Sequence, residues 1–260
     1  MSGMTFREFP PYHQVALGIH PHLEFVSKFG KNDDIDTGSV PEDVWDGQGT
    51  YTGFSVAAQT VDVVSDSAAD TAAGTGARTV QLEGLDANYE TITETVTLNG
   101  VTPVTTVQEF LRCFRAFVLT AGSGQENAGT LSISQSTSGD LMATVDALHG
   151  QTAIAAYTVP AGKTGLLIFT HILVTLTTGG SAAAEVDFRI RPEGGAWRAI
   201  ENNFVSSNSP LVFNHAFPFV LEEKTDIVVR VHAVSANNVS CAATFDILLI
   251  PDSVLSGFIG

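Results

Sequence analysis

Hydrophobic and polar residues alternate with a period of two along most of the chain. Val80 and Leu82, and then Ile92, Val96 and Leu98, are separated by polar residues, and the pattern recurs over 186–190, 227–231 and 245–249. Such alternation, rich in Val, Ile, Thr and Phe, is typical of half-buried β-strands. Between these segments stand Asn99-Gly100, Gly179-Gly180, Gly194-Gly195 and Asn237-Asn238, which suit tight hairpins. The sequence therefore predicts an all-β fold.

Helix signals are scarce, and the best one lies in a single short segment. Thr106 and Glu109 have capping-box spacing ahead of Phe110 and Leu111, so we expect a short helix or turn over Thr106–Cys113.

The same pattern divides the chain into three parts. Residues 1–48 lack alternation and contain Pro10-Pro11, Pro21 and Pro41, which predicts an extended anchoring arm that buries its aromatic residues against a neighbour. Residues 49–138 are expected to form a β-sandwich domain. The Ser/Gly-rich stretch 134–139 and residues 139–149 are interpreted as a linker, and residues 150–260 as a second, jelly-roll-like β-sandwich domain.

Composition narrows the choice of partners. The 28 acidic residues outnumber the 12 basic ones, for a net charge of -16, which argues against nucleic acid because phosphate binding requires Lys and Arg. The longest apolar runs are too short to span a bilayer, and we recognise no signal peptide. Cys113 and Cys241 each lie in apolar sequence, so we expect two buried thiols in a protein that folds in a reducing cytoplasm.

No catalytic or cofactor motif stands out. A G-x-S-x-G elbow is absent, and 161–164 resembles the end of a phosphate loop but lacks its first glycine. His20-Pro21-His22 lacks a third metal ligand, and the Asn32/Asp34/Asp36 loop has Thr37 where a calcium loop needs glycine. We therefore expect a protein that is not an enzyme and binds no cofactor or metal.

The remaining candidates are aromatic residues beside turns. We expect Tyr12, Phe25, Phe29, Trp45 and Tyr51 to serve as assembly or interface residues. For Trp45 and Tyr51, as for Phe54, Trp197 and Phe204, core packing is the alternative reading. Trp197, with Arg198 and Asn202 nearby, is the segment expected to contact a glycan if the chain binds one.

Several stretches also resemble structural proteins of tailed bacteriophages. They are Phe25–Asn32, Asp36-Thr37, Glu42–Tyr51, Gly74–Val80, Gly84–Asp86, Glu94–Gly100, Thr158–Thr164 and Glu223–Ile227. The resemblance implies a non-enzymatic virion protein assembled in the host cytoplasm, most simply a capsid decoration (cement) or head-fibre protein that docks by its N-terminal arm. It further implies the major capsid protein or other virion proteins as partners, and a homotrimer. The alternative is a tail-associated module that recognises a host surface glycan.

Overall fold

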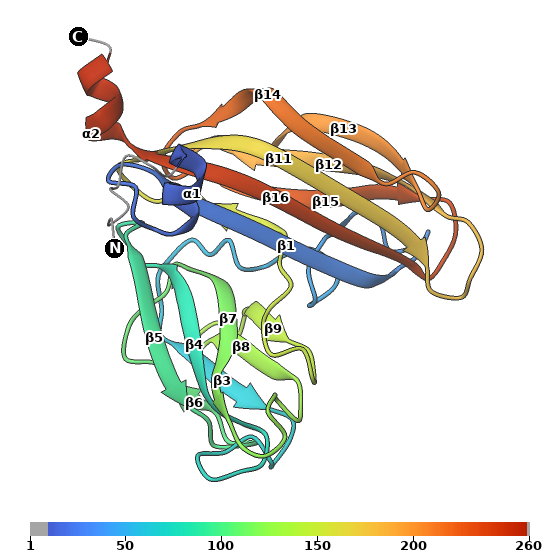
Figure 1. Cartoon of the computed structure of the whole chain (residues 1–260). Coiled ribbons are helices and arrows are strands. Elements are labelled where there is room, and N and C mark those ends of the chain that lie inside the picture. Colours follow the sequence, from blue (N-terminus) through green and yellow to red (C-terminus); the bar gives the residue numbers. More distant parts are fainter. Residues whose placement is uncertain (1–9, 259–260) are drawn as a thin grey trace, which may run out of the picture.

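The structure, a computed structural model, describes residues 10–258 and is built almost entirely of antiparallel β-sheets. Two sheets form the upper half of the molecule in Figure 1. The front sheet has the order β1 (Glu24–Ile35), β16 (Val239–Pro251), β11 (Lys163–Leu176) and β14 (Leu211–Leu221). The back sheet has the order β10 (Ala156–Thr158), β15 (Asp226–Val234), β12 (Ala183–Arg191) and β13 (Arg198–Ser206), and β2 (Glu42–Asp43) also pairs with β15.

Two smaller sheets form the lower half in Figure 1. One has the order β6 (Val104–Thr105), β3 (Val61–Ser65), β8 (Leu131–Gln135) and β9 (Leu141–Val145). The other has the order β5 (Thr91–Thr97), β4 (Ala77–Leu85) and β7 (Arg112–Ala121). The all-β prediction is confirmed, as four antiparallel sheets. The division into two sandwich domains, and the jelly-roll form of the second, remain predictions.

Each half encloses a hydrophobic core. In the upper half Phe188 and Phe245 meet edge to face at 5.2 Å between the front and back sheets. In the lower half the buried side chains of Val63, Val80 and Ile133 share a second core. The cores extend across the junction, because the first includes Leu85 and Phe114 of the lower half and the second includes Ala156 and Val228 of the upper half. The halves therefore stabilise each other.

Most of the expected arm is part of the front sheet. Residues 24–35 form β1, which pairs with β16 from Glu24 opposite Leu249 to Ile35 opposite Val239. The alternation is hidden in the sequence because Lys28, Gly30 and Asn32 occupy inward positions where apolar residues are usual. Gly30 is required there, since a Cβ atom would lie 2.1 Å from the backbone nitrogen of Ala155. The first nine residues of the expected arm lie outside the described residues.

Two further local expectations differ from the structure. The expected linker begins in a hairpin turn, because residues 136–140 join β8 to β9 within one sheet. No helix forms over 106–113. The Thr106 hydroxyl instead accepts a hydrogen bond from Val61 N at 2.9 Å, and the Glu94 carboxylate accepts two from the backbone of Val107 and Gln108. Side chains distant in sequence thus replace the local cap.

The helices lie near the chain ends. They are α1 (Pro11–Ala16), which lies over one end of the front sheet, α2 (Asp252–Leu255) and the 3₁₀ turn η2 (Ser256–Phe258) (Figure 1). No helix within residues 10–258 is long and apolar enough to cross a membrane. The prediction of buried thiols is confirmed: Cys113 and Cys241 are free and buried, and burial raises the pKa of each to about 12.

Candidate functional site

A buried ion-pair network joins the two halves. Arg112 on β7 contacts Asp226 on β15 at 3.1 Å, and Arg191 on β12 approaches the other oxygen of the same carboxylate at 2.6 Å. Thr158 donates a further hydrogen bond to Asp226 at 2.6 Å. Two arginines and a hydroxyl therefore compensate one buried carboxylate, which makes the network favourable only while all partners are present.

A cleft opens beside this network. Its volume is about 430 Å³, and its walls come from the back sheet and from the loops of the lower half, with Phe54, Gln59, Gln135, Asp140, Arg191, Trp197 and Arg230 among the lining residues. Trp197 is half-buried, with the Phe54 ring at 5.2 Å and the Arg191 guanidinium at 4.9 Å. One part of the indole is therefore already occupied by protein groups.

The three residues predicted to contact a glycan are not gathered in one place. Of these, Trp197 lines the cleft and Arg198 does not, although it is exposed. Asn202 donates hydrogen bonds to Glu185 at 2.9 Å and Asp187 at 2.6 Å in the back sheet. The sequence analysis missed the ion pair of Arg230 with Asp43, which also lines the cleft, because its members lie 187 positions apart.

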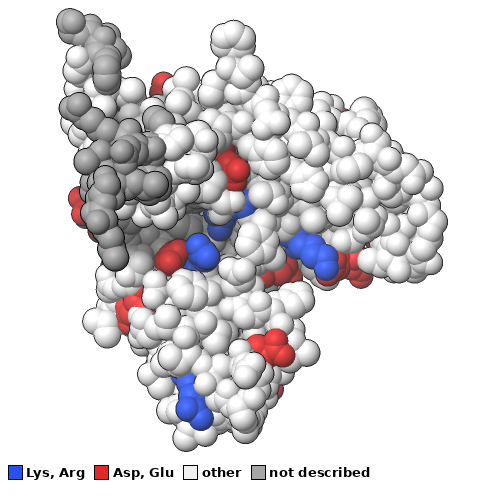
Figure 2. Space-filling view, in the orientation of Figure 1, with Lys and Arg blue, Asp and Glu red and all other residues white. Residues whose placement is uncertain are grey.

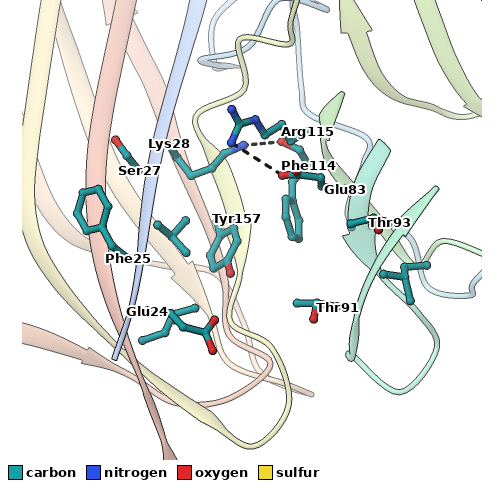
Figure 3. Close-up of a pocket in the computed structure, with 14 residues that line it drawn as sticks. Glu24, Phe25, Ser27, Lys28, Glu83, Thr91, Thr93, Phe114, Arg115 and Tyr157 are labelled. Carbon is teal, nitrogen blue, oxygen red and sulfur yellow. Dashed lines mark hydrogen bonds and ion pairs between the residues drawn. The ribbon is translucent and has the colours of Figure 1, made fainter. Parts of the chain in front are cut away.

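A second cavity, of about 260 Å³, lies between β1 and the lower half. The Lys28 side chain reaches from β1 toward Phe114 and Arg115, and its amine donates a hydrogen bond to the Phe114 carbonyl (Figure 3). Burial, together with the nearby positive charge of Arg115, lowers the pKa of Lys28 to about 7. Arg115 itself lies 3.8 Å from Glu83. The cavity therefore holds an amine that is largely neutral above pH 7.

The outer surface around α1 and β1 carries exposed apolar side chains, which we call the anchor face. Its exposed members are Tyr12, Leu17, Phe25 and Phe29, and the partly buried Ile168 and Leu248 lie beside them in the cavity under α1. Tyr12 is 68% exposed and Phe25 is 45% exposed. A cavity of about 390 Å³ between α1 and the front sheet is lined almost wholly by apolar groups, Tyr12 and Phe25 among them. Figure 2 shows few charged side chains over the front sheet, with most of those in view near the junction of the halves.

Trp45 and Tyr51, also predicted as interface residues, are core residues instead. They are 2% and 5% exposed, their rings meet at 5.1 Å, and the Trp45 indole donates a hydrogen bond to Gly49 O. The neighbouring glycines explain the error. A Cβ atom at Gly47 would lie 2.3 Å from the Trp45 ring, so this glycine makes room for an aromatic ring beside it. The alternative reading, core packing, holds for both.

The candidate metal ligands do not converge. Within residues 10–258 no group of three His, Cys, Asp or Glu side chains could hold a metal ion. The Asn32 amide turns inward and donates to Glu42 at 2.8 Å, whereas the Asp36 carboxylate accepts a hydrogen bond from Asn238 N. These two members of the acidic loop therefore have separate structural roles.

Comparison with known proteins finds weak structural likenesses. No family model matches the chain, and no curated protein matches it. Among solved structures, the chain is similar to a chain in the structure of the Gt strain of infectious bursal disease virus. The identity is 12%, the TM-score is 0.24, and the match covers 94% of this chain and 78% of the viral chain. It is also similar to derived T=1 particles of infectious bursal virus, with 14% identity, a TM-score of 0.22, and coverage of 94% and 76%. These neighbours are viral particle proteins, but likenesses this weak carry no argument about function.

Proposed function

We propose that the chain is a non-enzymatic structural protein of a virus particle that docks onto other virion proteins through the anchor face. The observation that carries this proposal is the exposure of Tyr12, Leu17 and Phe25 on one side of an acidic protein with a net charge of -16. Contiguous exposed apolar side chains usually mark an interaction surface. The resemblance of several sequence stretches to structural proteins of tailed bacteriophages supports a virion location.

The structure changes which residues form the docking element. Deleting residues 1–48 would remove β1 and β2, and with them one edge of the front sheet and the pairing of β2 with β15. Such a truncation would damage the fold instead of testing docking. We therefore assign docking to α1 and the outward side chains of β1, and not to a free arm.

The finer proposal is a capsid decoration (cement) or head-fibre protein of a tailed phage. Its partner would be the major capsid protein, and it would be assembled in the host cytoplasm. In this arrangement the anchor face contacts the shell and the far end of the upper half points outward.

Co-sedimentation tests the docking surface. Particles assembled without the protein are mixed with the wild type, with a Tyr12→Asp/Phe25→Asp variant, and with a Val56→Asp/Val107→Asp control. The control residues are highly exposed and lie outside the anchor face, and both variants add two negative charges. We expect the wild type and the control to bind, and the anchor-face variant to bind at least about 10-fold more weakly. Equal binding by all three proteins would refute the proposal.

The alternative function, recognition of a host glycan, is favoured by one feature. The cleft combines aromatic rings, Trp197 and Phe54, with amide and carboxylate side chains, Gln59, Gln135 and Asp140, which is a combination suited to a polyhydroxylated ligand. Glycan binding would change the fluorescence of Trp197 and be lost in Trp197→Ala. A glycan array without a hit at millimolar sugar would refute this alternative.

A further inference from the structure

Both sheets of the upper half end at the same side of the molecule. The front sheet ends in β14 and the back sheet ends in β13, and within residues 10–258 no strand pairs with the outer side of either (Figure 1). Glu201 of β13 and His215 of β14 approach to 3.5 Å, which places the two edge strands opposite each other. Unpaired N–H and C=O groups of edge strands are a template for pairing with another chain.

The side chains at this edge are largely apolar and exposed. Phe217 is 93% exposed and Phe204 is 81% exposed, and Val212, Phe213 and Val220 are also exposed. We call these five residues the open edge. Three exposed phenylalanines on these two edge strands are costly in water, because each leaves a large apolar area unburied.

The open edge lacks the charged side chains that usually protect an edge strand against association. From residue 202 to residue 221 the chain contains no Asp, Glu, Lys or Arg, although 40 such residues occur in the whole sequence (28 acidic and 12 basic). Natural edge strands are normally kept apart by charges, especially Lys, by proline or by short length. Here β13 and β14 span 9 and 11 residues; Pro218 and a register shift over residues 215–218 interrupt β14, and a register shift at Ile200 interrupts β13, so charge is the protection that is missing.

Charge identifies the occupant. Two copies of a chain with a net charge of -16 repel each other over most of their surfaces, so copies can meet only where charge is absent. A basic partner would instead be attracted to the acidic surfaces elsewhere. We infer that the open edge binds the open edge of a second copy of this chain.

The base of the open edge is held in place before any partner arrives. The His215 ring is within 3.0 Å of the Thr170 hydroxyl and lies between the rings of Phe213 and Phe219, at 5.0 and 5.4 Å. The Glu201 carboxylate on β13 lies 3.5 Å from the His215 ring on β14. A surface whose side chains are already positioned loses less conformational entropy on binding.

Light scattering coupled to size-exclusion chromatography tests the inference at tens of micromolar protein. We compare the wild type with Phe204→Lys/Phe217→Lys and with a Val56→Lys/Val107→Lys control, which makes the same charge change at exposed apolar positions outside the open edge. We expect two or more chains per particle for the wild type and the control, and a 27.4 kDa monomer for the open-edge variant, whose association weakens at least about 100-fold.

Hydrogen exchange of the wild type adds a readout that needs no substitution. Amides of residues 202–221 should become more protected as the protein concentration rises. A monomeric wild type, or an open-edge variant that associates as the wild type does, would overturn the inference. Because particle docking is assigned to the anchor face, a monomer that still binds particles would refute this inference and leave the proposed function standing.

Discussion

Replacing Lys28 by methionine should change how the stability of the protein depends on pH. Lys28 is 6% exposed, its amine donates a hydrogen bond to the Phe114 carbonyl, and the amine lies 5.6 Å from the centre of the Phe114 ring. Within the described residues no carboxylate lies within ion-pair distance of it. Charging this amine in the folded protein is therefore unfavourable, which is why its pKa falls to about 7 from 10.5.

The size and sign of the effect follow from proton binding. Between pH 7 and pH 10.5 the unfolded chain holds a proton on Lys28 and the folded chain does not. In this range, Lys28 makes the free energy of unfolding of the wild type rise by about 1.4 kcal/mol per pH unit. This gain disappears as the pH falls toward 7, where the folded protein binds the proton as well. From pH 7.5 to 9.5 the wild type should gain roughly 2–3 kcal/mol relative to Lys28→Met.

Urea denaturation at pH 7.5, 8.5 and 9.5, followed by tryptophan fluorescence, measures this difference. Lys31→Met is the matched control, because Lys31 lies on the same strand with a half-exposed side chain. We expect the control to retain the wild-type dependence of unfolding free energy on pH. In Lys28→Met the slope of that dependence should be smaller by about 1.4 kcal/mol per pH unit, which corresponds to one proton. If Lys28→Met shows the wild-type slope, the reasoning about the buried amine is refuted.

Three other substitutions test separate parts of the structure. Asp226→Asn leaves Arg112 and Arg191 without their carboxylate, so urea denaturation should show a loss of about 3–5 kcal/mol in the free energy of unfolding; an unchanged midpoint would contradict this role. Burial raises the pKa of Asp46 to about 8, so the folded state keeps a proton that the unfolded state loses above pH 4. Stability of the wild type should therefore fall from pH 4 to 8, and Asp46→Asn, neutral throughout, should show a flatter profile in the same titration. Trp45→Ala should lower the free energy of unfolding by about 3–5 kcal/mol in thermal or urea unfolding, because it leaves a cavity where a buried ring was. An unchanged stability would contradict the assignment of Trp45 to the core.

The strands with regular alternation were predictable from sequence because one face of each is apolar and the other polar. Residues 183–191 show this clearly, with Val186, Phe188 and Ile190 buried between more polar neighbours. β1 was not predictable in the same way. Its inward positions include Lys28 and Asn32, whose polar groups are satisfied by Phe114 and Glu42, and these partners become visible only in three dimensions.

The candidate residues also differ in whether their role depends on contacts that are distant in sequence. Tyr12, Phe25 and Phe29 are exposed, as surface residues should be, but sequence alone could not show that Gly47 packs under the Trp45 ring. Likewise, the sequence points to Trp197 but not to the cleft that this residue lines. Arg230 and Asp43 were missed because their pairing depends on the contact of β2 with β15.

Light scattering of particles assembled without the protein, titrated with the purified chain, tests the central claim most directly. The account predicts saturable binding in many copies per particle, and loss of that binding when Tyr12 and Phe25 of the anchor face become aspartate. Particles that gain no mass at saturating protein, or gain it equally with the anchor-face variant, would contradict the assignment of this chain as a structural protein that docks through that face.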